Sequence, residues 1–122
     1  MTISEADLQQ TIIEAARAHG YLVYHASNSR RSEPGFPDLV IAGGADLCKA
    51  MVWFVECKAG RGRLTSGRVS PRTGRRLPGQ KDWAMVLAAL SLLANSRVAY
   101  YLVRPGNLDE LLADLELHAK AA

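Results

Sequence analysis

The sequence predicts an α/β fold in which a small central mixed β-sheet is flanked by α-helices. Short apolar segments with strand composition are interspersed with longer segments whose apolar residues recur at helical spacing. Glycine, proline, serine and asparagine stand at the boundaries between these segments. The length of 122 residues fits one domain, so we expect residues 1–122 to fold as a single unit.

The first half of the chain predicts one helix and three strands. Ser4 resembles an N-cap, the apolar residues after it recur at helical spacing, and Gly20 is a natural stop for the helix. Residues 26–36 are rich in Ser, Asn, Arg, Pro and Gly, so they predict a loop. The expected strands are residues 21–25, 38–42 and 51–57.

The second half predicts a loop, a helix, a strand and a further helix. Residues 59–79 contain five glycines and two prolines, so we expect an exposed, mobile loop there. Residues 98–103 predict a strand, and Asn107 is expected to cap a last amphipathic helix. The helix expected at residues 80–95 has an inward face made of Trp83, Leu87, Leu90 and Ala94.

The basic residues are concentrated in one stretch of the sequence. The formal net charge is only +3, yet residues 58–81 hold eight basic residues and no acidic one. Such an arginine-rich stretch is typical of a surface that binds polyphosphate, although a solvated loop without a partner is an equal alternative. The DNA-binding candidates are Arg30, Arg31, Arg61, Arg63, Arg68, Arg72, Arg75, Arg76 and Lys81.

Composition argues against several classes of protein. No apolar run approaches the roughly 18 residues that a membrane-spanning helix needs, so we expect no membrane partner. The two cysteines, Cys48 and Cys57, lack zinc-site spacing and fit core or incidental positions better than nucleophilic ones. The N-terminal segment has the pattern of an amphipathic helix rather than a secretory signal. We therefore expect a reduced, cytoplasmic compartment.

Two predicted strands carry charged residues where they meet the loops. The first strand begins after Pro37 with Asp38, and the second ends with Glu56, Cys57 and Lys58. Because side chains alternate along a strand, Glu56 and Lys58 share one face. If the two strands pair antiparallel, Asp38 and Glu56 meet near one end of the sheet. Two adjacent carboxylates repel each other unless a cation lies between them.

This constellation predicts a site for a hard divalent cation. Carboxylate oxygens suit Mg²⁺ or Mn²⁺, which keep several water ligands and share phosphate oxygens with a substrate. The backbone carbonyl of Cys57 is placed to add a third oxygen, and Lys58 to polarise the attacking water or offset phosphate charge. The ordinary alternative is a surface ion pair, Glu56 with Lys58, and a turn residue, Asp38. The order of the motifs and the arginine-rich loop after them favour the catalytic interpretation.

The same residues resemble a known nuclease family. The chain is similar to the VRR-NUC domains of the PD-(D/E)xK nuclease superfamily in the pattern Gly35-x-Pro37-Asp38, Glu56-x-Lys58 and Gln80. The resemblance spans nearly the whole chain and implies a restriction-endonuclease-like core, with a central mixed sheet between helices. It also implies two further site residues, a glutamate in the first helix and a glutamine after the Glu-x-Lys strand.

Two residues on predicted helices fit these further positions. At about 100° per residue, Glu5 lies within about 20° of Ile12, whereas Glu14 lies about 160° from it, so Glu5 is expected to face inward. Gln80 lies on the expected inward face of its helix, where it would bond the attacking water, a phosphate oxygen or Lys58. The ordinary alternatives are a first-turn acid that suits the helix dipole and a cap at the helix start.

The first functional hypothesis is a metal-dependent, structure-selective DNA endonuclease that resolves four-way (Holliday) junctions as a homodimer. Stand-alone family members of bacterial and phage origin are similar to Holliday-junction resolvases and act as dimers, so the resemblance implies branched DNA and a second copy as partners. The alternatives are a repair or restriction-type nuclease on flapped or duplex DNA, and a non-catalytic nucleic-acid-binding module. A dimer interface is expected from residues 98–103 with Trp53, Phe54, Tyr100 and Tyr101. The ordinary alternative is that these residues fill the core of a monomer.

Overall fold

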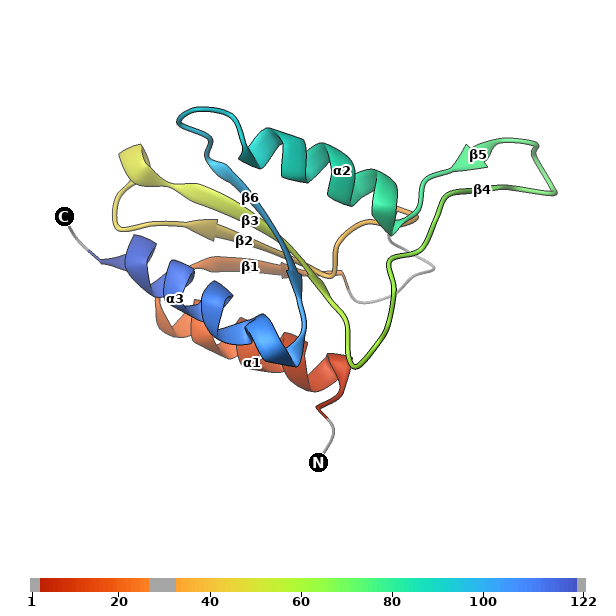
Figure 1. Cartoon of the computed structure of the whole chain (residues 1–122). Helices are drawn as coiled ribbons and strands as arrows, with labels where there is room; N and C mark the ends of the chain where they lie inside the picture. Colours follow the sequence, from red (N-terminus) through yellow and green to blue (C-terminus); the bar gives the residue numbers. More distant parts are fainter. Residues whose placement is uncertain (1–2, 27–32, 121–122) are drawn as a thin grey trace.

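The structure, a computed structural model, describes residues 3–26 and 33–120 and shows a mixed α/β fold (Figure 1). Its helices are α1 (Glu5–Ala18), α2 (Gln80–Ser91) and α3 (Leu108–Ala119). The main sheet contains β1 (Leu22–His25), β2 (Leu39–Gly43), β3 (Met51–Cys57) and β6 (Val98–Val103). Two shorter strands form a separate ribbon, β4 (Arg68–Val69) and β5 (Arg76–Leu77). Two single-turn 3₁₀ helices are Leu47–Lys49 and Pro105–Asn107.

The main sheet is mixed, as expected, and its order is β1-β2-β3-β6. The first three strands are antiparallel neighbours, and β6 runs parallel to β3 after the crossover through α2. In the β2–β3 pair Leu39 lies opposite Val55. One step further along this register, Asp38 faces Glu56, which is the juxtaposition predicted for antiparallel strands.

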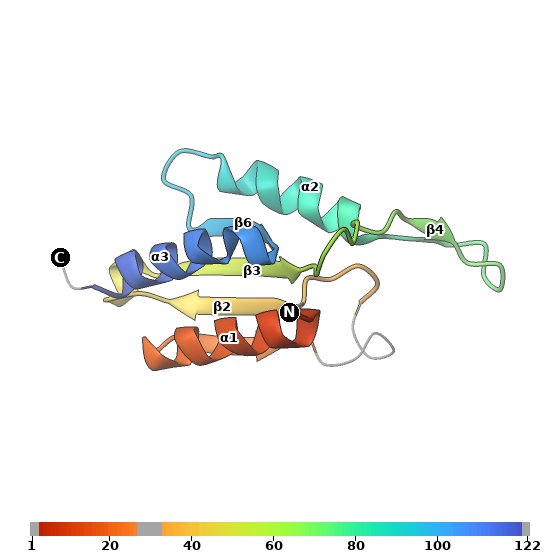
Figure 2. The same cartoon turned by 60° about the horizontal axis from the view of Figure 1, so that its bottom comes forward.

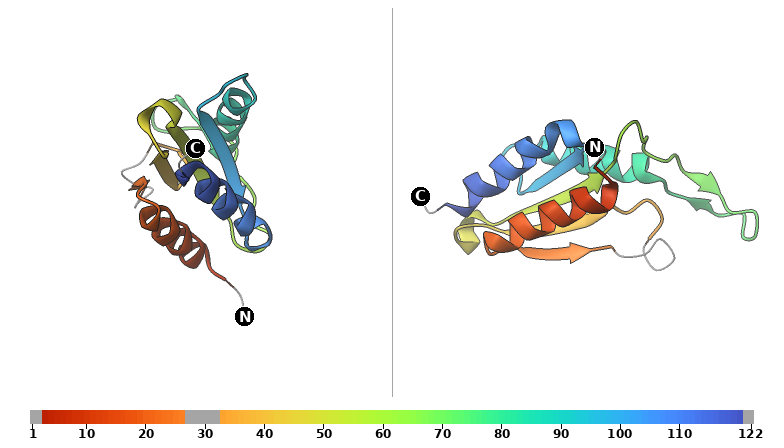
Figure 3. Two further views of the ribbon diagram at one scale, coloured as in Figure 1. Left: turned by 90° about the vertical axis from the view of Figure 1, so that its left-hand side faces the viewer. Right: turned by 90° about the horizontal axis from the view of Figure 1, so that it is seen from below.

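The helices form layers on the two faces of the sheet. Figure 2 shows α2 on one side and α1 on the other, and Figure 3 shows α1 and α3 side by side beneath the strands. The face toward α1 and α3 carries Trp53, Val55 and Cys57, all fully buried in the main core. Alternation places Phe54 and Glu56 on the opposite face, beneath α2. The charged residue at the end of β3 therefore lies between the sheet and the first turn of α2.

Helix α1 begins and ends where its sequence predicts. The Ser4 side chain accepts a hydrogen bond from the backbone N–H of Asp7 at 3.0 Å, and the Asp7 carboxylate accepts one from the N–H of Ser4. This reciprocal cap satisfies backbone donors that the first turn leaves free, and is worth about 1 kcal/mol. At the other end Gly20 takes a φ of +85°, a left-handed conformation that glycine adopts without strain.

The second half departs from prediction at two helix ends. Helix α2 ends at Ser91 instead of Asn95, because the chain turns there and Asn95 takes a left-handed φ of +58°. Leu90, in the last turn of α2, and Ala94, beyond the helix, are both exposed, so the prediction that they face inward is wrong. Asn107 precedes α3, but its side chain accepts from the N–H of Arg104 and donates to the Leu102 carbonyl. It closes the preceding 3₁₀ turn instead of capping α3.

Residues 59–79 were expected to be a mobile loop, and they contain a short antiparallel ribbon instead. Arg68 pairs with Leu77 and Val69 with Arg76, and the turn between them is closed by an N–H of Ser70 that donates to the Arg75 carbonyl at 2.8 Å. The ribbon projects beyond the end of the main sheet, next to the start of α2 (Figure 1). Two-residue strands are too short to show an alternating pattern, so the sequence could not predict them.

Two other expectations concern membrane-spanning helices and the position of Trp53. No helix within residues 3–26 and 33–120 is both long enough and apolar enough to span a bilayer. The indole N–H of the buried Trp53 donates to Asp114 Oδ2 at 3.0 Å, and the Tyr101 hydroxyl donates to the same oxygen at 2.9 Å. Trp53 is thus a core residue, which is one of the two roles that the sequence left open for it.

Candidate active site

Two acidic side chains lie together where β2 begins and β3 ends. Glu56 has only 2% of its surface exposed and is the one buried charged residue in the part of the chain that the structure describes. Opposite it, the Asp38 carboxylate accepts a hydrogen bond from the backbone N–H of Cys57 at 2.8 Å. This bond fixes Asp38 against the last residue of β3, so both carboxyl groups point to one side of the sheet end.

The surroundings of Glu56 penalise its negative charge. Burial, followed by the neighbouring Asp38 carboxylate, raises the pKa of Glu56 from its usual 4.5 to about 9, although Lys58 acts in the opposite direction. With this pKa the Glu56 carboxyl holds a proton at neutral pH in the cation-free protein. A divalent cation between the two carboxyl groups would replace that proton and remove the repulsion, which is the chemistry predicted from the sequence.

The donors suit a hard cation that keeps much of its hydration. Within residues 3–26 and 33–120 no group of three or more His, Cys, Asp or Glu side chains is arranged as a metal site. Asp38 and Glu56 alone would leave several positions to water and to substrate oxygens, which is how Mg²⁺ is commonly bound. The backbone carbonyl of Cys57, the expected third ligand, stays a prediction. The hydrogen bond observed between Cys57 and the site is made by its N–H, which donates to Asp38.

Gln80, the first residue of α2, connects Glu56 to a distant part of the chain. Its side-chain amide donates to Glu56 Oε1 at 2.9 Å, and its carbonyl oxygen accepts the backbone N–H of Thr65 at 3.0 Å. The prediction that Gln80 points inward to the site is confirmed. Its partners are a carboxyl group and the 59–79 segment, whereas the expected bond to Lys58 is not among its contacts.

Glu5 reaches the site by a different route from the one expected. It is exposed in the first turn of α1, so the inward-facing prediction is wrong. Its carboxylate nevertheless lies beside the end of β3, where Oε1 accepts the N–H of Ala59 at 3.4 Å. Glu14 faces solvent as expected and bonds only Gln10. Glu5 therefore stands at the rim of the site as a third carboxylate.

Two neighbours of Glu56 in the sequence have distinct environments. Lys58 follows the last residue of β3, is half-buried and packs against the turn at Gly62. Cys57 is fully buried in the core, and burial, followed by Asp38 and then Glu56, raises the pKa of its thiol to about 12. Its burial confirms the prediction that Cys57 is a core residue.

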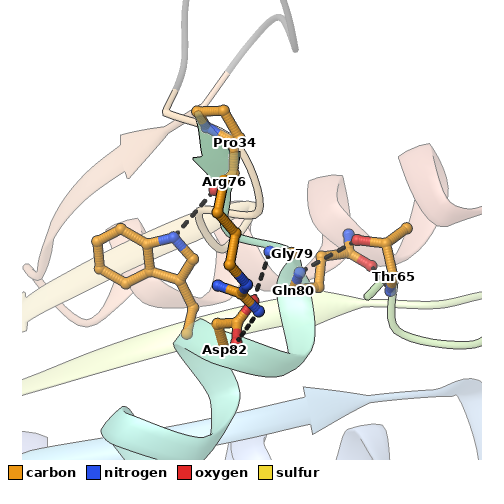
Figure 4. Close-up of polar contacts among 7 residues, drawn as sticks. Pro34, Thr65, Arg76, Gly79, Gln80 and Asp82 are labelled. Atoms are coloured by element: carbon orange, nitrogen blue, oxygen red, sulfur yellow. Dashed lines mark hydrogen bonds and ion pairs between the residues drawn. The ribbon is translucent and has the colours of Figure 1, made fainter. Parts of the chain in front are cut away.

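A cavity of about 200 Å³ opens beside the carboxylate pair. Its walls come from the turn before β2, from Thr65 and from the start of α2, and include Glu33, Pro34, Phe36, Asp38, Thr65 and Gln80. The wall at Phe36 is firm, because its ring packs edge-on against Trp83 at 5.0 Å and Phe54 at 6.2 Å. The Trp83 indole N–H also donates to the Pro34 carbonyl at 3.1 Å (Figure 4). This cavity is the space through which a substrate group can reach Asp38.

The basic candidates divide into three groups. One group is exposed and lies along the ribbon and its flanks: Arg61, Arg63, Arg68, Arg72, Arg75 and Lys81. Arg76 is exposed as well, but its guanidinium pairs with Asp82 at 3.1 Å on the first turn of α2 (Figure 4). That carboxylate also accepts the N–H of Gly79, and this bond and Arg76 lower the pKa of Asp82. Arg30 and Arg31 lie outside the described residues.

Sequence reasoning missed the residues that support the site. Thr65 bonds Gln80, and Arg104 donates to the carbonyl groups of Gly60 and Gly62 at 3.3 and 2.7 Å, which braces the turn after Lys58. A lone threonine in an arginine-rich segment and an arginine after a strand carry no sequence signal for these roles. Their functions arise only from tertiary contacts.

The structure thus brings Asp38, Glu56, Lys58 and Gln80 together at one end of the sheet, with Glu5 at the rim. Comparison of the chain with protein-family models, with curated proteins and with solved structures found no match. The geometry of these five residues therefore carries the functional argument.

Proposed function

We propose that the protein is a Mg²⁺- or Mn²⁺-dependent endodeoxyribonuclease that hydrolyses phosphodiester bonds. The observation that carries this proposal is the buried Glu56 carboxyl opposite Asp38, with Lys58 beside it, next to a cavity that Asp38 and Gln80 line. Burying an acid next to another acid costs stability, and such arrangements cluster at functional sites. The resemblance to VRR-NUC domains supports the same conclusion, with the mixed sheet as a restriction-endonuclease-like core.

Each residue of the site has a role that follows from its position. Asp38 and Glu56 would hold the cation, which when bound supplies a polarised water and neutralises phosphate charge. The Lys58 ammonium stabilises the charge that develops on the phosphate oxygens. Gln80 occupies Glu56 Oε1 with a hydrogen bond and so leaves the other carboxyl oxygen free to face the cation.

The exposed arginines of the ribbon supply the DNA-binding surface in this proposal. They lie at the same end of the molecule as the carboxylate pair, because the ribbon joins the end of β3 to the start of α2 (Figure 2). Basic side chains at this place neutralise backbone phosphates on either side of the scissile bond. Such contacts supply affinity without reading sequence, which fits a nuclease that selects DNA by its shape.

The proposal also includes the substrate and the oligomeric state: branched DNA, specifically a four-way junction, and a homodimer. A two-fold symmetric protein can place two active sites on a two-fold symmetric junction. An uncharged apolar surface favours a second copy. Residues 83–96 contain no charged residue, and α2 with the turn after it exposes Met85, Val86, Leu90, Leu92 and Leu93, here called the α2 ridge. At the start of the ridge an apolar hollow of about 260 Å³ is lined by Pro78, Trp83 and Val86, together with Asp82.

Cleavage assays test this proposal directly. Labelled four-way junction, flap, duplex and single-stranded DNA would be incubated with the protein and Mg²⁺, Mn²⁺ or EDTA. We expect cleavage only with a divalent cation and fastest on the junction, and we expect Asp38→Asn, Glu56→Gln and Lys58→Met to abolish it while the circular dichroism spectrum is unchanged. Normal cleavage by Asp38→Asn or Glu56→Gln would show that the cation site is wrong. A preference for flap or duplex would replace the junction by those substrates.

A further inference from the structure

Thr65 makes three hydrogen bonds to the first turn of α2, although fifteen residues separate it from Gln80. Its hydroxyl accepts the backbone N–H of Gln80 at 3.1 Å, and its carbonyl accepts the N–H of Lys81 at 3.0 Å. Its own N–H donates to Gln80 Oε1 at 3.0 Å (Figure 4). Helix α2 has Gly79 at its N-cap and so lacks a side-chain cap of its own. Thr65 therefore supplies the cap from a remote segment.

The third of these bonds sets the orientation of the Gln80 amide. An amide group has one accepting and one donating end, so the end that accepts from Thr65 determines which end faces Glu56. Because the Thr65 N–H holds the Oε1 atom of Gln80, the Nε2 atom of Gln80 is directed at Glu56 Oε1 and donates to it at 2.9 Å. If the amide turned over, its oxygen would face a carboxyl oxygen, which is unfavourable whenever Glu56 is ionised.

The same part of the chain is held by close backbone packing. A methyl group on Gly79 would lie 2.6 Å from the Gly67 nitrogen and closer still to the Ser66 carbonyl carbon. A methyl group on Gly35 would lie 2.8 Å from the Gln80 nitrogen and closer still to the Gly79 carbonyl carbon. The base of the ribbon, the start of α2 and the turn that leads to Asp38 are thus stacked backbone on backbone. This stack, here called the glycine joint, leaves little freedom for the ribbon to move independently of the site.

We infer that Thr65 is a positioning residue, which orients Gln80 toward Glu56 and joins the DNA-binding ribbon to the cation site. Through it the β4–β5 ribbon and the carboxylate pair behave as one rigid unit. DNA held by the ribbon arginines then lies at a fixed distance from the cation. This inference rests on the proposed nuclease function and extends it to a residue with no chemistry of its own.

The test compares two substitutions at Thr65 with a matched substitution elsewhere on the ribbon. The backbone N–H of residue 65 is present in every variant, so the test asks whether the hydroxyl bond to the Gln80 N–H keeps the N–H of residue 65 on Gln80 Oε1. Thr65→Val removes this hydroxyl anchor at nearly constant volume, and Thr65→Ser keeps it. Thr73→Val makes the same chemical change at the ribbon turn, where the Thr73 hydroxyl accepts only the N–H of Arg75, at 3.2 Å. For each protein three quantities would be measured: the single-turnover cleavage rate at saturating junction DNA, the Kd for DNA as a function of salt, and Mn²⁺ affinity by calorimetry.

We expect Thr65→Val to lower the saturated rate and the Mn²⁺ affinity by about tenfold, as for the loss of an outer partner of a metal ligand. The Kd for DNA and its salt dependence should be unchanged, Thr65→Ser should restore the rate, and Thr73→Val should match the wild type. Thr65→Val with the wild-type rate and Mn²⁺ affinity would overturn the inference alone. A raised Kd with a normal saturated rate would also overturn it, and would make Thr65 a binding residue. If the wild-type protein neither cuts DNA nor binds Mn²⁺, the proposed function fails first.

Discussion

In the proposed site two demands fall on the Glu56 side chain: it is buried, which fixes its position, and it would have to be ionised to bind a cation. In the cation-free protein burial and Asp38 raise its pKa to about 9. The Gln80 amide satisfies one of its oxygens, which lowers the cost of burial but does not remove the repulsion. Such a residue lowers the stability of the fold for the sake of function, as is common at active sites.

This conflict predicts how stability depends on pH. Between the ordinary pKa of 4.5 and the folded-state value of about 9, the unfolded chain releases a proton that folded Glu56 keeps. The free energy of unfolding of the wild type should therefore fall as pH rises through this window, in EDTA. Glu56→Gln has no such proton, so its curve should be flatter and should lie above the wild type at the alkaline end.

Urea denaturation from about pH 5 to about pH 9 measures both curves. Glu110→Gln, an exposed glutamate in the first turn of α3, is the matched control and should follow the wild type. Parallel curves for the wild type and Glu56→Gln would show that Glu56 is ionised throughout this range.

Among individual residues, the sequence predicts those of the proposed cation and phosphate site better than the residues that hold them in place. Asp38, Glu56 and Lys58 were identified because alternation along two strands dictates which side chains share a face. Gln80 was identified because helical periodicity turned it inward. Glu5 was identified for a reason that is wrong, since it is exposed and reaches the site from the first turn of α1. Thr65 could not be predicted, because its role depends on two segments meeting in space.

Among the elements, the β4–β5 ribbon differs most from expectation and matters most for the proposed DNA binding. Its strands are too short for periodicity, and the many glycines between residues 59 and 79 suggested freedom of the backbone. Instead, Gly79 permits the close packing of the ribbon base against α2. The strands β3 and β6 were predicted to the residue, because each is a short, nearly continuous run of apolar residues bounded by polar ones.

The ribbon predicts a salt-dependent loss of DNA affinity when its free arginines are neutralised. Arg72 and Arg75 are exposed and lie near the turn, whereas Arg76 is paired with Asp82 and is left intact. The double variant Arg72→Ala/Arg75→Ala should bind DNA more weakly, and its slope of log affinity against log salt should shrink by about 2, near 0.9 for each lost phosphate contact.

Fluorescence anisotropy across a salt series measures this slope. The charge-matched control is Arg17→Ala/Lys49→Ala. Arg17 lies in the last turn of α1 and Lys49 lies just before β3, so both are at the end of the sheet that is away from the site. Equal slopes in the two double variants would mean that the ribbon does not contact phosphate.

At the level of the whole molecule, the α2 ridge is an apolar surface that no other described element covers. Met85 on α2 and Leu92 in the turn after it expose 69% and 86% of their surfaces, whereas the other side of α2 packs on the sheet. The sequence suggested residues 98–103 as interface instead, because an apolar strand looks equally suited to a core and to a contact. Burial decides between these two roles, and burial depends on how α2 and α3 cover the sheet.

The ridge predicts a two-fold dimer that a single charge disrupts. Val86→Glu places a carboxylate beside the apolar hollow at the start of the ridge, and should shift the protein from dimer to monomer and reduce junction cleavage. The control is Leu117→Glu, an equally exposed apolar position on α3, on the opposite side of the sheet. Sedimentation velocity at micromolar protein, with and without junction DNA, separates the two species. A wild-type monomer in both conditions would remove the dimer from the proposal.

The glycine joint affects how the results of a mutational screen of this protein should be interpreted. Gly35 and Gly79 have no room for a single methyl group, and Gly35 also takes a φ of +78°, so almost any replacement displaces the chain on which Asp38 or Gln80 sits. A saturation library selected for activity would therefore rank these glycines with the acidic pair, although neither carries a reactive group. The positions that tolerate no substitution in such a screen would therefore include residues that hold the backbone in place as well as residues that take part in the reaction. Only a cation-binding measurement on the purified variants would distinguish the two.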